Sequence, residues 1–231
     1  MDREKQIARM RSKAQAVEAS LIKSQSVKEV RICGIDEAGR GPLAGPVVVA
    51  AVHISSKIDA NLDFLADVDD SKRMSEKDRE RLFELLTSHP EIRYAVSSKS
   101  AAEIDRVNIL QATMMAMHEV ASEMAENSGV NFVLIDGNRL PWGHEKAVRK
   151  DGSIRPADPA MPGWIKGAES VIGGDSTVLC IAAASIIAKV TRDKIMVKLD
   201  KEFPQYGFRK HKGYGTREHM QQIRKHGGKV G

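Results

Sequence analysis

Four carboxylate residues stand where apolar, strand-like stretches of the sequence stop. Asp36 and Glu37 follow "VRICGI", Asp136 follows "NFVLI", and Asp175 follows "ESVIGG". A single Asp at such a point is more often a turn former or a helix cap. If the strands are neighbours in one sheet, however, the acids gather at one edge, where like charges raise one another's pKa unless a cation intervenes. A metal site is therefore the hypothesis, and turn-capping acids in an ordinary α/β protein are the alternative.

The types of ligand indicate which metal would bind. No run of basic side chains flanks these acids in the sequence, so a divalent cation is the economical way to neutralise them. Carboxylates without His or Cys suit Mg²⁺ or Mn²⁺ rather than zinc. Two such ions can activate a water and stabilise the departing oxygen of a phosphodiester. Consecutive strand residues point to opposite faces, so Glu37 can join Asp36 in one site only if the backbone bends at Ala38-Gly39.

An arginine between two glycines follows the first acid pair. Gly39 and Gly41 would let main-chain N–H and C=O groups beside Arg40 approach a ligand closely. The spacing to Gly45 does not fit the dinucleotide-binding fingerprint, and a strand follows where that motif needs a helix. A tight hairpin with a solvated arginine is an equally good interpretation.

Further polar and basic residues could contact an anionic ligand. Ser71 and Lys72 precede a predicted helix, where a phosphate could sit. Ser185 and Lys189 lie one turn apart on a second predicted helix. Tyr214 stands between glycines in the basic stretch "RKHKGYGT", where its ring could stack on a base or a sugar. Taken singly, each is explained as well by a solvated loop or, for Ser185, by small-residue packing.

Composition and charge restrict the class of protein. The chain has 231 residues, of which 42% are hydrophobic and 29% charged, as expected of a soluble globular protein. Residues 201–231 carry eight basic and two acidic residues, a net of +6 where the whole chain has +5, which favours a polyanionic partner. The charged N-terminus lacks an apolar signal segment, and "VVVAAV" is too short to cross a bilayer, so we expect a cytoplasmic protein with no membrane partner. Cys33 and Cys180 are expected to be buried, reduced thiols.

The order of predicted elements is that of an α/β protein on a mixed sheet, with a helical C-terminal segment. We expect a helical extension with a linker over 1–29 and one catalytic domain over 30–231, and a monomer. Ser75 is a predicted helix cap, and Ser100 and Glu103 form a capping box that opens a helix to about residue 125. The predicted strands are 29–36, 46–54, 92–100, 131–137 and 168–175, and the other helices are 3–24, 177–203 and 215–228. The Gly/Pro-rich stretch 141–167 argues against regular structure.

Several motifs, in this order, resemble those of ribonuclease HII. They are "GIDEAGRGPLAGPVVVAAV", "DSKRMS", "IDRVNILQATMMAM", "LIDGN", "GGDS", "AAASIIAKVTRD" and "HKGYGT". They span about residues 34–216, and the first and the last two are highly specific. A sister family, ribonuclease HIII, shares the acids but not "GRG".

The resemblance implies a ribonuclease H-like fold and a Mg²⁺- or Mn²⁺-dependent endonuclease. Such an enzyme cuts the RNA strand of RNA–DNA hybrids, nicks 5′ of a ribonucleotide embedded in duplex DNA, and leaves 3′-hydroxyl and 5′-phosphate ends, as ribonucleotide excision repair requires. Its four acids correspond to Asp36, Glu37, Asp136 and Asp175. Its "GRG" element corresponds to the reader of the ribose 2′-hydroxyl, and Tyr214 to the ring that stacks on the sugar beyond the RNA–DNA junction.

Two departures from the family pattern and two alternative functions accompany this hypothesis. Asp136 and Asp175 are 39 positions apart because of the 141–167 stretch, which makes Asp175 the least firmly placed acid. The N-terminal extension lies outside the resemblance.

A junction resolvase on the same fold would cut without a 2′-hydroxyl, so an all-DNA substrate distinguishes it. A binding module without catalysis would be expected to carry Asn or Ser in place of the acids.

Overall fold

The computed structural model describes residues 12, 16, 29–55, 58, 63–69, 71–72, 74–142, 147–148, 154–155 and 160–228. The predicted N-terminal helix and most of the stretch 141–167 therefore lie outside the described residues.

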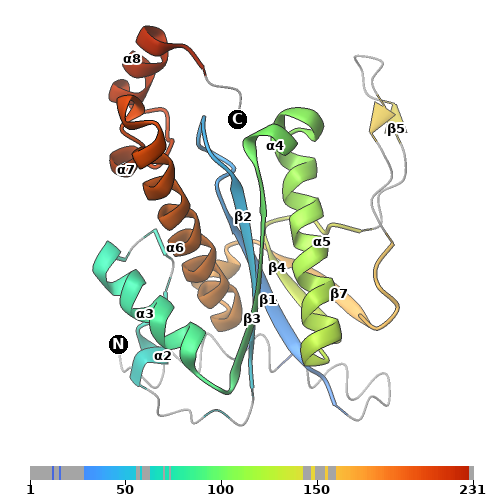
Figure 1. Ribbon diagram of the computed structural model, residues 1–231. Helices are drawn as coiled ribbons and strands as arrows, with labels where there is room; N and C mark the ends of the chain where they lie inside the picture. Colours follow the sequence, from blue (N-terminus) through green and yellow to red (C-terminus); the bar gives the residue numbers. More distant parts are fainter. Residues whose placement is uncertain are drawn as a thin grey trace.

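Five strands form a mixed sheet in the order β3-β2-β1-β4-β7 (Figure 1). The strands are β1 (Ile32–Ala38), β2 (Val47–Ile54), β3 (Ile92–Lys99), β4 (Phe132–Asp136) and β7 (Gly167–Val171). Strand β1 pairs with β2 in antiparallel and with β4 in parallel orientation, and β7 runs parallel to β4. The predicted mixed sheet is confirmed. Because β1 and β4 are parallel neighbours, their carboxyl ends meet at one edge.

Helices cover both faces of this sheet. The helical segments are α2 (Asp63–Ala66), α3 (Glu76–Ser88), α4 (Ala101–Val107), α5 (Ile109–Ser128), η1 (Gly174–Ser176), α6 (Leu179–Glu202), η2 (Pro204–Tyr206), α7 (Phe208–His211) and α8 (Arg217–His226). Helices α3 and α6 cover one face and α5 the other, while α7 and α8 lie at the far end of α6 (Figure 1). The predicted caps Ser75 and Ser100, and Thr216 at the start of α8, each accept a main-chain hydrogen bond.

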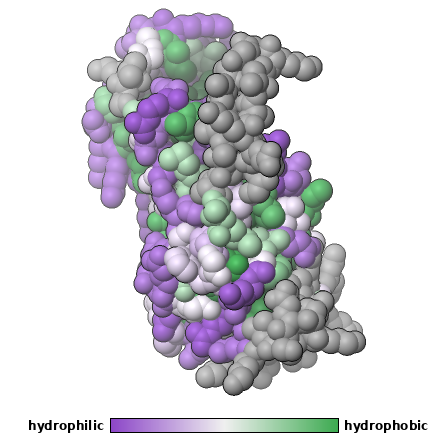
Figure 2. All heavy atoms as spheres, turned by 90° about the vertical axis from the view of Figure 1, so that its right-hand side faces the viewer, coloured by the Kyte–Doolittle hydropathy of each residue, from purple (hydrophilic) through white to green (hydrophobic). Residues whose placement is uncertain are grey.

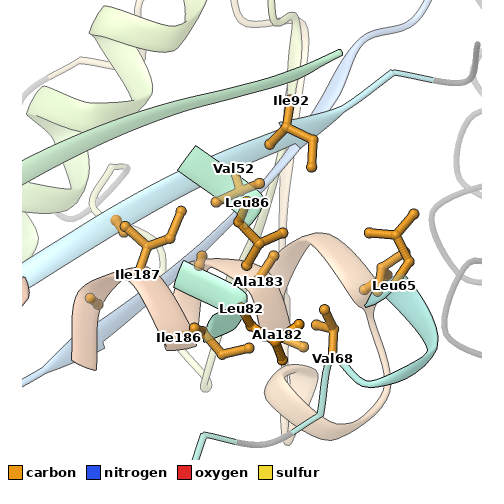
Figure 3. Packing of buried hydrophobic residues seen from close by; sticks show 14 of the residues in the cluster. Val52, Leu65, Val68, Leu82, Leu86, Ile92, Ala182, Ala183, Ile186 and Ile187 are labelled. Atoms are coloured by element: carbon orange, nitrogen blue, oxygen red, sulfur yellow. The ribbon is translucent and has the colours of Figure 1, made fainter. Parts of the chain in front are cut away.

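The hydrophobic core on one face of the sheet fixes the position of helix α6. Leu82 and Leu86 of α3 share one buried cluster with Ile186 and Ile187 of α6 (Figure 3). Strand β1 lets α6 come very close, because a Cβ atom at Gly34 would lie 2.3 Å from the amide nitrogen of Ile181. Such contact excludes any side chain at that position and places α6 directly against β1.

Three predictions of secondary structure were wrong. The helix expected from 100 to 125 breaks at Asn108, which has φ 71°, ends α4, and caps α5 through its side chain. The last strand ends at Val171, so Asp175 lies in the η1 turn and not at a strand end. Within 141–167, β5 (Ala147–Val148) and β6 (Ile154–Arg155) form a short antiparallel pair. A high content of glycine and proline does not exclude so short a pair, because strands of two residues depend little on the β-propensity of their residues.

The described surface is mixed in character. Small hydrophobic spots interrupt a largely hydrophilic face in Figure 2. No helix among the described residues is both long and apolar enough to span a bilayer. Cys33 and Cys180 are buried free thiols, as predicted.

Candidate active site

Three of the four predicted acids converge at the edge of the sheet. One carboxylate oxygen each from Asp36, Asp136 and Asp175 lies within 4.8 Å of the others. Asp36 and Asp136 are adjacent because each directly follows the paired residues Ile35 and Ile135 of β1 and β4. Asp36 is followed by two further strand residues, whereas Asp136 is the last residue of β4. The topology thus brings together acids that are 100 and 39 residues apart.

The turn before α6 brings Asp175 to the other two acids. The amides of Gly174 and Asp175 donate to Oδ1 of Asp136 at 2.7 and 3.4 Å. A Cβ at Gly174 would lie 2.6 Å from Cδ1 of Ile181 and 3.2 Å from Oδ1 of Asp136. A side chain at Gly174 would therefore displace the end of Ile181 and crowd the Asp136 carboxylate, which favours glycine before Asp175 in the "GGDS" motif.

The cluster is electrostatically unfavourable without a cation. Burial, together with the negative charges of Glu37 and Asp136, raises the pKa of Asp36 well above its usual range. Burial and the charge of Asp175 raise the pKa of Asp136 as well. Oxygen donors this close, with raised pKa values, are a ligand set that suits Mg²⁺ or Mn²⁺. The residues therefore fit the divalent metal that the sequence predicts.

Glu37 lies outside the converging group. Its Oε1 accepts from Nη1 of Arg40 at 3.1 Å. The alternation of the strand places Glu37 on the same face as Ile35, which packs toward α5, while Asp36 lies on the α6 face. Burial raises the pKa of Glu37 and the charge of Arg40 opposes that rise. Glu37 is not among the acids that converge within 4.8 Å, although the charges of Asp136 and Lys72 also act on its pKa, so a ligand role for Glu37 stays a prediction.

A chain of hydroxyl groups supports Asp36 from the α6 face. Ser185 lies close enough to Asp36 to oppose the rise in its pKa, and its Oγ lies 2.9 Å from Oγ of Ser71. Ser71 is only 3% exposed, so it supports Ser185 and does not present an open phosphate site. Ser185 is therefore more than small-residue packing.

Basic groups do lie next to the acids, which the sequence did not indicate. Nζ of Lys72 lies 3.1 Å from Oδ2 of Asp175. Lys189 pairs with Asp193 at 2.7 Å and lies 5.9 Å from the ring centroid of Tyr214, whose side chain is partly exposed. Lys72 therefore borders the acid cluster, whereas Lys189 lies near Tyr214.

The two glycines beside Arg40 differ in what surrounds them. Gly39 has φ +114°, and a Cβ there would lie 2.5 Å from the carbonyl oxygen of Pro46. Among the described residues, a Cβ at Gly41 would have one neighbour within 4 Å, Cε1 of Tyr214 at 3.8 Å. Gly39 is thus required by the turn, whereas Gly41 faces open space beside the Tyr214 ring.

Sequence reasoning missed one residue of this region. Arg192 is 1% exposed, and its guanidinium donates to main-chain carbonyls near both Gly39 and Tyr214. One signal could have indicated it. Arg192 is seven residues after Ser185, which places the two side chains on the same face of the predicted helix.

A mixed five-stranded sheet with acids at the ends of adjacent parallel strands defines a hydrolase of the ribonuclease H-like class. The fold is similar to ribonuclease H2 from Pyrococcus horikoshii, with a TM-score of 0.58 and 24% identity over 87% of this chain and 90% of that one. It is also similar to the protein named Bst-RNase HIII in complex with Mn²⁺, with a TM-score of 0.62 and 18% identity over 86% and 63% of the two chains.

The sequence comparisons then identify the family. The Ribonuclease HII family model matches residues 33–230. The Ribonuclease HII of Francisella philomiragia is 44% identical over 85% of this chain and 90% of its own length, and that of Burkholderia thailandensis is 44% identical over 85% and 78%. The chain belongs to the ribonuclease HII family. It is a metal-dependent ribonuclease H of type HII, which cuts the RNA strand of RNA–DNA hybrids.

Proposed function

We propose that this enzyme nicks duplex DNA 5′ of a single embedded ribonucleotide, by a two-metal mechanism that leaves 3′-hydroxyl and 5′-phosphate ends. The observation that carries the proposal is the position of Gly41. Gly41 lies beside the Tyr214 ring, in the β1–β2 hairpin that also carries Asp36. The reading element is therefore only five residues from Asp36 along one hairpin.

The chemistry of the substrate supports a main-chain reader at this hairpin. At one nucleotide, the 2′-hydroxyl is the group that distinguishes RNA from DNA, and it is both a donor and an acceptor. Main-chain N–H and C=O groups without a covering side chain can approach such a group closely. Gly41 offers this access, and the exposed edge of Tyr214 offers a surface on which the neighbouring sugar can stack.

Asp36, Asp136 and Asp175 would hold the metal, with Glu37 as a further ligand. When bound, two Mg²⁺ or Mn²⁺ ions would activate the attacking water and stabilise the leaving oxygen. The solved structure of Bst-RNase HIII contains Mn²⁺, and the donor set here is compatible with the same ion. Asp36 would be the central ligand of the three, because it lies beside Asp136 and is the most strongly buried.

The basic groups of the chain have roles that need no metal. Lys72, at the edge of the acid cluster, and Lys189, near Tyr214, would bind phosphates on either side of the cleaved bond. Helix α8 ends with the basic residues Arg224 and Lys225, and we assign them to the duplex backbone further away. We further propose a cytoplasmic monomer that starts ribonucleotide excision repair.

The test uses three labelled substrates of one sequence: an all-DNA duplex, the same duplex with one ribonucleotide, and a continuous RNA–DNA hybrid. Each is incubated with Mg²⁺, Mn²⁺ or EDTA. We expect a metal-dependent nick 5′ of the ribonucleotide, and intact all-DNA duplex. Asp36→Asn should abolish cutting, whereas Asp105→Asn, an exposed Asp of α4, should not change it.

Two outcomes would contradict the proposal. Equal cutting of the all-DNA duplex would favour a resolvase-like nuclease. Cutting of the hybrid alone, with the single-ribonucleotide duplex intact, would limit the enzyme to hybrids.

A further inference from the structure

Arg192 is a fully buried charged side chain of α6 whose hydrogen bonds all go to the main chain. Its Nε donates to the carbonyl of Pro46 at 2.9 Å, Nη2 to that of Ala44 at 3.0 Å, and Nη1 to that of Lys212 at 2.8 Å. A guanidinium is the side chain that can donate in three directions from one rigid plane. Three carbonyls are thus held at fixed positions around one group.

The three carbonyls belong to two loops that are far apart in the sequence. Ala44 and Pro46 are in the β1–β2 hairpin, which contains Gly41, and Lys212 is two residues before Tyr214. The two loops also touch directly, because the amide of Leu43 donates to the carbonyl of Gly213 at 2.9 Å. Arg192 therefore lies at the junction of the two proposed reading elements.

Three glycines leave the room that this junction needs. A Cβ at Gly39 would lie 2.6 Å from Nε of Arg192, and a Cβ at Gly45 would lie 3.3 Å from Nη2. A Cβ at Gly213 would lie 2.3 Å from the carbonyl oxygen of Ala44. All three glycines have positive φ, between 83° and 114°. The backbone of both loops is therefore shaped around the guanidinium.

The same helix connects this junction to the acids. Ser185, Lys189 and Arg192 follow one another at spacings of four and three residues, which places them on one face of α6. The rise of a helix puts Arg192 roughly 10 Å along the axis from Ser185. Ser185 lies close enough to Asp36 to affect its pKa, and the guanidinium carbon of Arg192 lies 5.9 Å from the ring centroid of Tyr214. One rigid element thus spaces the stacking ring from the acid cluster.

We infer that Arg192 is a positioning residue that holds the Gly41 hairpin and the Tyr214 loop in one fixed arrangement, and so sets selectivity for single ribonucleotides. The inference rests on the proposed nicking activity. A single ribonucleotide offers one 2′-hydroxyl, so its recognition needs both loops in register. A continuous hybrid offers many 2′-hydroxyls and tolerates looser placement.

The test compares Arg192→Met and Arg192→Lys with the wild type on the single-ribonucleotide duplex and the continuous hybrid. We expect Arg192→Met to lower kcat/KM for the single ribonucleotide by about 10- to 100-fold, the range known for small misplacements at a distance. The hybrid should lose far less. Arg192→Lys keeps the charge but not the fork, so it should restore little. Lys198→Met, the same kind of change at an exposed position of α6, should match the wild type.

Two further readouts separate positioning from general damage. In a double-mutant cycle with Tyr214→Ala, Arg192→Met should add little, because both changes disable the same arrangement. Hydrogen exchange should show the Leu43 amide losing protection in Arg192→Met, while amides of β1 keep theirs.

The outcomes distinguish this inference from the proposed function. Equal loss on both substrates, additive effects with Tyr214→Ala, or unchanged protection of Leu43 would overturn the role of Arg192. If wild-type enzyme does not nick the single-ribonucleotide duplex, the proposed function fails instead. Should Arg192→Met not fold, Arg192→Lys carries the same comparison, with Mn²⁺-induced thermal stabilisation as the check of an intact acid cluster.

Discussion

The ammonium nitrogen of Lys72 lies 3.1 Å from Oδ2 of Asp175, a residue 103 positions further along the chain. The lysine side chain is 75% exposed, so water screens this ion pair and it contributes little to stability. Its position matters more, because it places a positive charge beside an acid cluster that could hold a divalent cation.

Lys72→Met should separate metal binding from substrate binding. Without the lysine charge, Mn²⁺ should bind the free enzyme about two- to fivefold more tightly, a change in the range expected for an exposed charge. The KM for the single-ribonucleotide duplex should rise, because a phosphate loses its partner. Calorimetric titration with Mn²⁺ and steady-state kinetics measure the two effects. Unchanged KM would remove Lys72 from the substrate contacts.

Asp36→Asn should make the metal-free protein more stable while it abolishes activity. The substitution removes a buried negative charge that is repelled by Glu37 and Asp136. A gain of about 1 kcal/mol would raise the Tm by roughly 2–4 °C at this chain length. Mn²⁺ should raise the Tm of the wild type but not of Asp36→Asn. Differential scanning calorimetry with EDTA or Mn²⁺ tests this, with Asp105→Asn as the control.

The same carboxylates predict the pH dependence of the metal-free protein. The folded-state pKa values of Asp36 and Asp136 are raised, so the folded state binds protons more tightly than the unfolded state. Their contribution to stability is fully present below the unfolded pKa, about 4, and is lost as pH rises through the folded values. In EDTA, the Tm of the wild type should therefore fall behind that of Asp36→Asn as pH rises. A constant difference between them would contradict the raised pKa.

The two glycines beside Arg40 should respond differently to alanine. Gly41→Ala should fold normally, because its new methyl group would make only an ordinary contact with Tyr214, at 3.8 Å. It should lose selectivity for the single ribonucleotide, because the methyl group covers the main chain beside that ring. Gly39→Ala should instead lower the Tm, because φ is +114° and the methyl group would collide with Pro46 and Arg192. Arg40→Ala should affect selectivity less than Gly41→Ala. Thermal melts alongside nicking assays would show whether the two losses have different origins.

His219 should make the Tyr214 loop sensitive to acid. Its Nδ1 lies 2.9 Å from the carbonyl oxygen of Tyr214, and its ring stacks on His211 with centroids 4.4 Å apart. Burial lowers the pKa of His219, and the charge of His211 lowers it further. The stability from a lowered pKa is present above the unfolded value, about 6.5, and is lost as pH falls through the folded value. His219→Asn should therefore reduce the fall in Tm between about pH 7 and 5. If the variant shows the same fall as the wild type, groups other than His219 cause it.

Much of the fold follows from local patterns in the sequence. The strands up to β4, the capping box at Ser100 and the caps at Ser75 and Thr216 depend on side chains within a few residues, so the sequence contains the needed information. The break at Asn108 was missed, because an Asn with φ 71° is tolerated only where the surrounding structure requires it. Asp175 was assigned to a strand end because a strand followed by a short helical turn has no distinct signature.

The sequence by itself determined which chemical groups this protein has: four acids for a divalent metal, glycines that expose a backbone, and an aromatic ring in a basic loop. Only the tertiary structure decided which of them meet. Parallel pairing of β1 with β4 brings Asp36 beside Asp136, while Glu37 forms an ion pair with Arg40. Arg192 binds Ala44, 148 residues away, and such a contact depends on how α6 packs on the sheet. The energy of such long-range contacts comes from burial and close packing, which no short stretch of sequence encodes.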